Sequence, residues 1–331
     1  MKVAGVTLVC PNCKGGLARD DDGLGCGSCG ARYPVVAGIP DCRILPDPWI
    51  SIPDDRAKAR RLAGLTGGLD FPAAVQAYWD ITPETPDDRK RHFIRAVLDG
   101  ERLAAEWVAT FPDARRDAGP WLDLGCGTGN LLSAVAARGI EAIGLDIALR
   151  WLVVACRRPG FETGEQLLCG DAAHLPFEDG AFGTVTALGV LEHCHDLPGV
   201  LGEVHRVLRP GGRFAARTVN RYSLLPEPHV GVWGAGYLPR AWADRYVHWR
   251  TGMRYVHHYP RSAPVLAAGL RRAGFRVARV TAARTLTTDR ARLGRVTRRA
   301  VPVYERARLL PGLRWAARTL APLLDVEATR S

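Results

Sequence analysis

Four of the nine cysteines lie within the first thirty residues, in two pairs whose spacing suits a metal ion. The pairs are Cys10 with Cys13 and Cys26 with Cys29, and each has two residues between its cysteines. Such a pair places two thiolates on one side of a tight turn, and two facing pairs form the tetrahedral sulfur site of zinc. Four thiolates leave no open coordination position, so a structural ion is expected rather than a catalytic one. Disulfides are the alternative, which a reducing cytoplasm disfavours.

A glycine-rich turn lies further along the chain, where residues 121–130 read WLDLGCGTGN. The apolar residues before the glycines predict a strand, and residues 131–137 (LLSAVAA) predict a helix after them. Glycines let the backbone bend sharply and approach a ligand closely, and a helix start offers free N–H groups. Dinucleotide-binding proteins use a similar turn, so the turn alone is a weak signal.

A second strand, predicted over residues 141–146 (EAIGLD), makes the ligand more specific. It ends in Asp146, about twenty residues beyond the turn. A carboxylate at that position can accept hydrogen bonds from both hydroxyls of a ribose. Turn and acid together therefore predict a ligand that contains a nucleoside.

With these residues the chain resembles the class I S-adenosylmethionine-dependent methyltransferases of the methyltransferase type 11-like group. The segment DLGCGTG at 123–129 matches the first motif of that family. Later motifs follow in order at 169–172 (CGDA), 175–185 (LPFEDGAFGTV), 191–193 (LEH) and 201–214 (LGEVHRVLRPGGRF). The resemblance implies an α/β fold with a doubly wound, seven-stranded Rossmann-like sheet and a final antiparallel strand at 324–329. The cofactor is expected across the C-terminal edge of the strands.

The resemblance also implies which residues hold S-adenosylmethionine. The glycine backbone would cradle the methionine part, and Asp123 would orient its amino group. Asp146 would hold the ribose, and Asp171 with Ala172 would border the adenine. Each acid has an alternative role as a turn or cap residue. The complete predicted set is Asp123, Gly125, Cys126, Gly127, Gly129, Asp146, Ile147, Asp171, Ala172 and Leu188.

The segment from Leu8 to Asp41 resembles the small zinc-ribbon domain of the Trm112-like family, which occurs as a free methyltransferase activator and fused to methyltransferases. We therefore predict a ribbon with structural Zn²⁺ over residues 1–45. A linker with a cap helix near Ala73–Trp79 is predicted over residues 46–88, and a methyltransferase domain over residues 89–331. That domain would carry an aromatic-rich substrate insertion at 220–259 and a basic insertion at 284–321.

Residues 222–259 hold five Tyr, three Trp and four of the nine His. Aromatic walls with a few imidazoles suit a pocket for a ring system, a sugar or an acyl chain. The alternative is a helical cap in which Trp242, Tyr246 and Trp249 face a core. The sulfonium already makes the methyl group electrophilic, so a general base is needed only when the acceptor is protonated at neutral pH. The candidate bases are His193, His229, Tyr222 and His258.

The charge of the chain is concentrated near its end. Of the net charge of +11, the residues from Arg284 onwards contribute +7, with eleven Arg against four acids. Arg interleaved with Leu and Trp over residues 290–318 is typical of an interfacial helix on an anionic membrane. RNA phosphates and a solvated face are the alternatives. Pro302 and Pro311 are expected to break the segment into short helices.

Composition excludes some classes of protein. The 331 residues contain no run of 18 apolar residues, and the first residues lack the apolar segment of a secretory signal. We therefore expect a cytoplasmic protein, alternatively one peripheral to the membrane.

The predicted function is methyl transfer to a small-molecule, glycan or lipid-linked acceptor. One alternative is a ribosomal or transfer RNA base methyltransferase, and another is a non-catalytic cofactor-binding scaffold or activator. The acceptor atom and the oligomeric state stay open.

Overall fold

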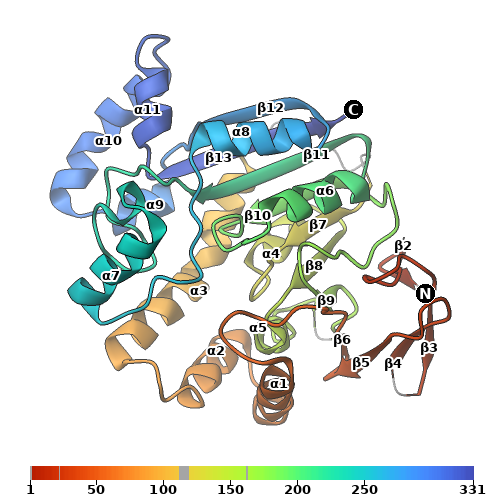
Figure 1. Cartoon of the computed structure of the whole chain (residues 1–331). Coiled ribbons are helices and arrows are strands. Elements are labelled where there is room, and N and C mark those ends of the chain that lie inside the picture. The colour runs from red at the N-terminus through yellow and green to blue at the C-terminus, as the bar shows by residue number, and fades with distance from the viewer. Residues whose placement is uncertain (1, 22, 112–118, 162) are drawn as a thin grey trace. The chain divides into compact units, whose positions relative to one another are not determined.

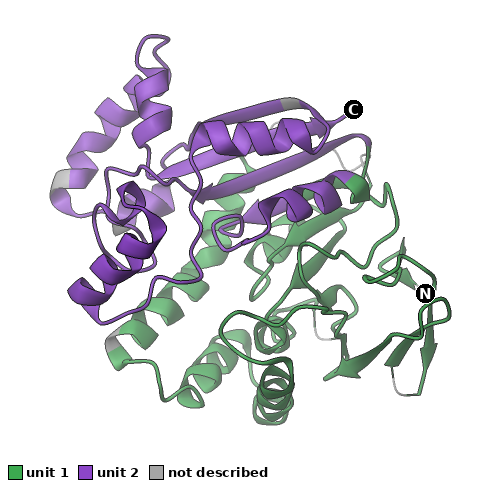
Figure 2. Ribbon diagram, viewed as in Figure 1, with its two compact units in different colours: residues 1–185, 206–209 green, residues 186–205, 210–331 purple. Residues whose placement is uncertain are grey.

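The computed structural model describes residues 2–21, 23–111, 119–161 and 163–331. The chain forms two compact units, coloured separately in Figure 2. Unit 1 comprises residues 1–185 and 206–209, and unit 2 comprises residues 186–205 and 210–331. Within the described ranges, no helix is both long enough and apolar enough to span a bilayer.

Unit 1 begins with small antiparallel sheets, drawn in red in Figure 1. The first is the pair β1 (Lys2–Val3) and β2 (Val6–Thr7), and the second has the order β3-β4-β5-β6. Its strands are β3 (Leu17–Asp20), β4 (Gly23–Cys26), β5 (Arg32–Val36) and β6 (Ile39–Pro40). Buried Leu24, Tyr33 and Ile39 form part of its apolar interior.

Three helices follow the ribbon in unit 1: α1 (Ile52–Thr66), α2 (Phe71–Asp80) and α3 (Asp87–Val108). Two of them start at side-chain caps, since Ser51 accepts from the N–H of Asp54 and Asp70 accepts from the N–H of Ala73. Helix α2 confirms the helix predicted near residues 73–79. Helices α1 and α2 bury Leu62 and Trp79 in one apolar cluster with strand β9.

The remaining strands of unit 1 form a sheet with the order β10-β7-β8-β9. Strands β7 (Trp121–Leu124), β8 (Ala142–Asp146) and β9 (Leu167–Cys169) are parallel. Helix α4 (Asn130–Ala136) connects β7 to β8, and helix α5 (Leu149–Ala155) lies between β8 and β9 in the chain. The registers pair Leu124 with Leu145 and Asp146 with Cys169. The strands therefore end at a common edge, as a doubly wound sheet requires.

Strand β10 (Phe182–Leu188) contributes its first residues to unit 1 and its last residues to unit 2. In unit 2 the strand order is β12-β13-β11-β10, and β13 is antiparallel to both of its neighbours. Its bounds, Leu323–Arg330, confirm the predicted final strand. The other elements are α6 (Leu197–Val207), β11 (Leu208–Val219), η2 (Ala235–Tyr237), α7 (Arg240–Thr251), α8 (Ala263–Arg272), β12 (Phe275–Ala282), α9 (Thr287–Arg292), α10 (Arg295–Ala307) and α11 (Arg314–Leu320).

The prediction that Pro302 breaks the basic segment is wrong, because Pro302 lies inside helix α10. A proline in a helix interior removes one backbone hydrogen bond. Side chains of the same helix bond to the segment before α9. Tyr304 donates its hydroxyl to the carbonyl of Ala283 at 2.6 Å, and Glu305 accepts from the N–H of Thr285 at 2.7 Å. Pro311 does lie between two helices, α10 and α11, as predicted.

Candidate functional site

The glycine turn bends tightly over the end of strand β8 in unit 1. Gly125, Gly127 and Gly129 have φ angles of +71°, +53° and +79°, which side chains rarely tolerate. The backbone N–H groups of Gly125 and Cys126 both donate to the carbonyl of Leu145, at 2.7 and 3.1 Å. The turn is therefore attached to the strand that carries the predicted ribose ligand.

Asp146 is the residue that joins the turn to the second strand. One carboxylate oxygen accepts from the N–H of Gly127 at 2.8 Å, and the other accepts from the N–H of Ala148 at 2.8 Å. Burial raises the pKa of this carboxyl above its ordinary value. Each carboxylate oxygen has two acceptor sites, so Asp146 keeps the capacity to bind hydroxyl groups.

Asp171 follows strand β9 and is buried. One of its oxygens is paired with Nδ1 of His174 at 2.6 Å, and the other accepts from the N–H of Ile44 at 3.3 Å. The end of the predicted ribbon thus reaches the acid predicted to border an adenine. Of the remaining predicted residues, Asp123 is buried in unit 1, and Leu188 ends strand β10 in unit 2.

A buried ionic network supports this edge of unit 1, and sequence reasoning missed it. Arg43 pairs with Asp41 at 2.8 Å and with Asp55 at 2.7 Å, and all three side chains have no exposed surface. Arg150 pairs with the other oxygen of Asp55 at 2.9 Å. Burial alone would raise the pKa of Asp41, but the guanidinium of Arg43 holds it below its ordinary value. Because Arg43 also donates to the carbonyl of Ile147 at 2.9 Å, the network ties the ribbon and α1 to the residue after Asp146.

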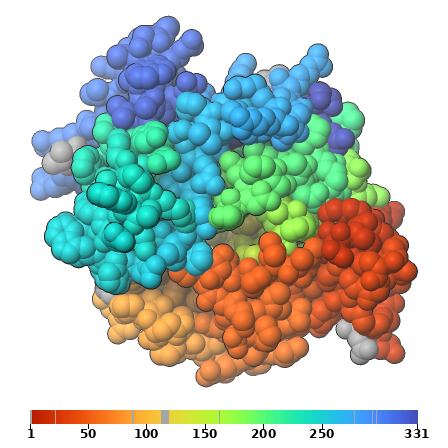
Figure 3. Space-filling model, viewed as in Figure 1, coloured from red at the N-terminus to blue at the C-terminus, as the bar shows by residue number. Residues whose placement is uncertain are grey.

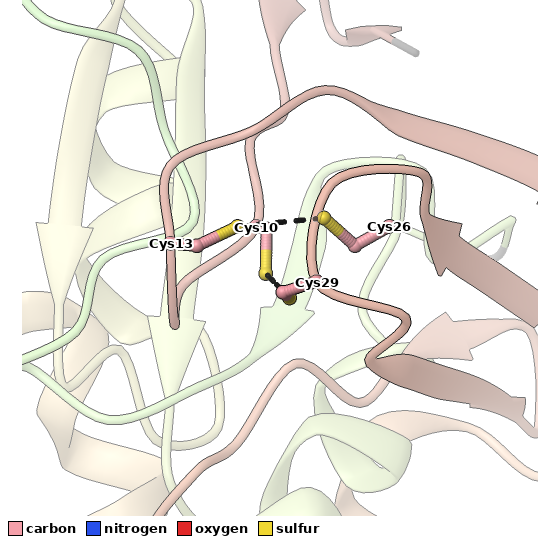
Figure 4. Close-up of side chains that lie close together, drawn as sticks. All are labelled: Cys10, Cys13, Cys26 and Cys29. Atoms are coloured by element: carbon pink, nitrogen blue, oxygen red, sulfur yellow. Dashed lines mark hydrogen bonds between the residues drawn. The ribbon is translucent and has the colours of Figure 1, made fainter.

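The four predicted metal ligands lie together in the ribbon (Figure 4). The sulfur atoms of Cys10 and Cys29 are 3.7 Å apart, and those of Cys13 and Cys26 are 3.5 Å apart. A tetrahedral zinc ion with bonds of about 2.3 Å places its sulfurs ~3.8 Å apart, whereas a disulfide bond is about 2.05 Å long. The sulfur separations are therefore compatible with a zinc ion, and they are longer than a disulfide bond.

The backbone of the ribbon favours a thiolate at Cys26. The N–H groups of Cys29 and Ser28 point at the sulfur of Cys26 and lower its pKa to about 6. Of the cysteines outside the ribbon, Cys42, Cys126, Cys156 and Cys169 are buried, and Cys194 is partly buried.

Three of the four predicted bases lie together in unit 2, namely His193, His229 and His258. The ring centroid of His193 lies 4.8 Å from that of His229 and 5.2 Å from that of His258. The rings of His229 and His258 stack on each other, with their centroids 4.6 Å apart. Tyr222 is outside this group, and its ring lies 5.6 Å from that of Tyr237. We call the three residues the histidine cluster.

Two buried glutamates accompany the histidine cluster. Glu192 belongs to the segment already quoted at 191–193, whereas sequence reasoning missed Glu227. Glu227 accepts from Nδ1 of His229 at 2.6 Å, and Glu192 accepts from the hydroxyl of Thr218 at 2.6 Å. Burial alone would lower the pKa of His229, but the carboxylate of Glu227 raises it. A His two residues after an acid, as at 227–229, was the only local signal for this pair.

The alternative that Trp242 and Trp249 face a core is wrong, because the two side chains are 65% and 76% exposed. Tyr246 does pack, partly buried, against the apolar cluster of this insertion. Helix α7 buries Ala243 and Val247 instead, which are one turn apart on its inner face. Tyr255 is the aromatic residue of this insertion that is buried, and it stacks on His258 with ring centroids 5.1 Å apart.

The C-terminal basic segment presents apolar side chains at the surface of unit 2, drawn in blue in Figure 3. Leu309 is 71% exposed and Trp315 is 68% exposed. Arg306 and Arg314 lie close to them in sequence, so the predicted mixture of basic and apolar groups is exposed.

Comparison with known proteins gives a consistent set of relatives. A family model described as a methyltransferase domain matches residues 122–216. A ubiquinone biosynthesis O-methyltransferase of Pseudomonas aeruginosa is 37% identical over 187 residues, which are 53% of this chain and 72% of that protein. A demethylmenaquinone methyltransferase of Thermus thermophilus is 38% identical over 121 residues, 35% of this chain and 51% of that protein.

A third relative is the biotin biosynthesis bifunctional protein BioHC of Cellvibrio japonicus. It is 32% identical over 187 residues, 53% of this chain and 34% of that protein. The chain thus spans about a third to a half of the length of several of these curated relatives.

Proposed function

This chain belongs to the S-adenosylmethionine-dependent methyltransferases, and from that premise we propose that it transfers the methyl group of S-adenosylmethionine to a small organic acceptor. The observation that carries the proposal is the attachment of Asp146 to Gly127 at 2.8 Å. It holds a carboxylate at the end of the second strand beside a glycine turn, as binding of a ribose next to a charged sulfur requires.

The residues of unit 1 are proposed to bind and orient the cofactor. Asp146 accepts the ribose hydroxyls, Asp171 and Ala172 border the adenine, and the turn from Gly125 to Gly129 holds the methionine part. The buried Arg43 network and the glycine turn fix these groups before the cofactor arrives, so little reorganisation is needed. The chemistry that S-adenosylmethionine supplies when bound is an electrophilic methyl group on a sulfonium.

We propose that the acceptor is a small or lipid-linked molecule rather than RNA. The names of the relatives refer to ubiquinone, demethylmenaquinone and biotin, all of them small molecules or lipids. The aromatic insertion of unit 2 supports an organic acceptor, because Tyr and His side chains suit ring systems. The exposed Leu309 and Trp315 among arginines support contact with an anionic membrane, where a lipid-linked acceptor resides.

The N-terminal ribbon is proposed to hold one structural Zn²⁺ through Cys10, Cys13, Cys26 and Cys29, as in Trm112-like domains. The sulfur separations of 3.5 and 3.7 Å support this assignment. The ion would stabilise the ribbon, whose small apolar interior is insufficient alone.

The test is transfer of a radiolabelled methyl group from S-adenosylmethionine in a lysate of the host, followed by separation into an organic extract and purified RNA. We expect label in the organic extract with the wild-type chain and with Glu141→Ala, and little with Asp146→Ala. Glu141 is an exposed acid just before strand β8 and serves as the control. Label in RNA would support the alternative of a base methyltransferase, and tight cofactor binding with no transfer would support a scaffold.

A further inference from the structure

The histidine cluster is assembled by three loops of unit 2 that are distant in sequence. His193 lies in the turn after strand β10, His229 in the loop before η2, and His258 in the segment between α7 and α8. One nitrogen from each ring lies within 4.8 Å of the other two. The backbone holds two of these loops together, because the N–H of Tyr259 donates to the carbonyl of Glu192 at 2.5 Å.

Glu227 orients one of the three rings in a way that leaves a specific nitrogen available. It accepts from Nδ1 of His229 at 2.6 Å, so Nε2 is the nitrogen that faces away from the carboxylate. Its other oxygen accepts from the N–H groups of His229 and Val230 at 2.9 and 3.1 Å, which fixes the carboxylate. A buried carboxylate on one imidazole nitrogen is the usual outer-shell partner of a histidine that binds metal through the other nitrogen.

The surroundings of the cluster are acidic and favour a cation. Glu192 and Glu227 are both buried beside the cluster, and a cation would offset their charge.

We propose that His193, His229 and His258 bind one divalent transition-metal ion, with Glu227 as the outer-shell carboxylate. Three imidazoles suit Zn²⁺ and Co²⁺. The ligand nitrogens lie within 4.8 Å of one another. A tetrahedral ion with bonds of about 2.0 Å needs nitrogens ~3.3 Å apart, so they must approach by up to ~1.5 Å when the ion binds. Three protein ligands leave one position for water or for an oxygen of another ligand.

Metal binding and proton transfer would use the same lone pairs of the imidazole nitrogens, so a cluster that binds an ion does not act as the base. Binding of the ion can be measured without any substrate, so its test does not depend on the proposed methyl transfer. The ion is also separable from the one proposed in the ribbon, because the two sites differ in ligand chemistry.

The experiment is a titration of the metal-free, reduced full chain with Co²⁺, followed by absorption spectroscopy, and with Zn²⁺, followed by metal analysis after gel filtration. Binding at the ribbon produces thiolate-to-cobalt charge-transfer bands, whereas binding at the cluster produces only the weaker ligand-field bands. The variants are His229→Ala, His258→Ala and Glu227→Gln. The control is His248→Ala, which removes an exposed histidine of helix α7.

We expect the wild-type chain and His248→Ala to bind one equivalent of metal that produces no thiolate bands. This equivalent is in addition to any ion that the ribbon binds. His229→Ala and His258→Ala should each lose that equivalent and keep any thiolate bands, which also reports that the rest of the chain is folded. Glu227→Gln should weaken the affinity by roughly 10–100-fold. The proposal is overturned if the wild-type chain binds metal only with thiolate bands, or if both histidine variants keep the second equivalent.

Discussion

The carboxylate of Asp146 accepts a hydrogen bond from the backbone N–H of Gly127 at 2.8 Å, across nineteen positions of the chain. The contact joins the end of strand β8 to the glycine turn that follows strand β7. It fixes the position of the acid relative to the glycine turn within unit 1. The proposed cofactor site depends on this relationship.

Asp146→Ala is expected to weaken binding of S-adenosylhomocysteine by a few kcal/mol, because hydrogen bonds to a charged group contribute roughly 1.5–3 kcal/mol each. Isothermal titration calorimetry measures the change. Glu141→Ala, an exposed acid just before the same strand, should bind with wild-type affinity. Equal affinity of Asp146→Ala and Glu141→Ala would show that the acid does not bind the nucleoside.

Cys26→Ser is expected to remove the thiolate-bound metal ion and to destabilise the ribbon, while the rest of the chain stays folded. Cobalt charge-transfer bands and the thermal transition of the chain report the two effects. Cys194→Ser, at a partly buried cysteine outside the ribbon, should keep the bands. Full thiolate bands in Cys26→Ser would contradict a site of four sulfurs.

Arg43→Ala is expected to destabilise the chain by about 3–5 kcal/mol, since it leaves the buried carboxylates of Asp41 and Asp55 without their shared partner. Urea unfolding gives the free energy of unfolding. Arg32→Ala is the control, because Arg32 pairs with Asp20 on the surface, where such pairs contribute less than about 1 kcal/mol. Similar losses in both variants would contradict the importance of the buried network.

The pair of Glu227 and His229 should make stability depend on pH. The pKa of His229 is raised from its ordinary value of 6.5. Its contribution to the free energy of unfolding is therefore fully present below pH 6.5 and is lost as the pH rises through the raised pKa of the folded state. The pKa of Glu227 is lowered from 4.5, so its contribution is present above that value and is lost as the pH falls through the folded-state pKa.

The difference in unfolding free energy between wild type and Glu227→Gln should therefore be largest between pH 4.5 and 6.5, with chelator present. Glu227→Gln should also lower the pKa of His229, which nuclear magnetic resonance of the imidazole protons measures. A constant difference across this range, with an unchanged pKa, would contradict the ion pair.

Trp315→Ala is expected to reduce binding to vesicles that contain anionic lipid, because it removes an exposed apolar group from the basic segment. Sedimentation with anionic and with zwitterionic vesicles measures the effect. Trp249→Ala removes a similarly exposed Trp from helix α7, and this variant should bind to the vesicles like the wild type. No binding of the wild-type chain to anionic vesicles would rule out the proposed membrane contact.

The local motifs could be predicted from sequence because their signals are contained in short segments. The glycine turn, Asp146 and the cysteine pairs were each predicted from fixed spacing. In the structure the N–H of Gly127 lies 2.8 Å from Asp146, and the four cysteines form one cluster of their own. Strand β13 was also predicted, although its partners β11 and β12 lie far away in the chain. In that case the resemblance to a family, rather than local pattern, supplied the expectation.

The long-range polar contacts could not be predicted in the same way. Asp55 and Arg150 are 95 residues apart, and no local pattern links them. The candidate bases His193, His229 and His258 were identified individually, but only the fold brings them together. The prediction failed for the two tryptophans of α7 because Ala243 and Val247 occupy its buried face.

The most direct test of the cofactor site is a crystal structure of the chain with S-adenosylhomocysteine. We predict that both ribose hydroxyls lie within hydrogen-bond distance of Asp146 and that the homocysteine part contacts the turn from Gly125 to Gly129. Ligand density at another place, or preferential binding of a nicotinamide dinucleotide over this turn, would contradict it.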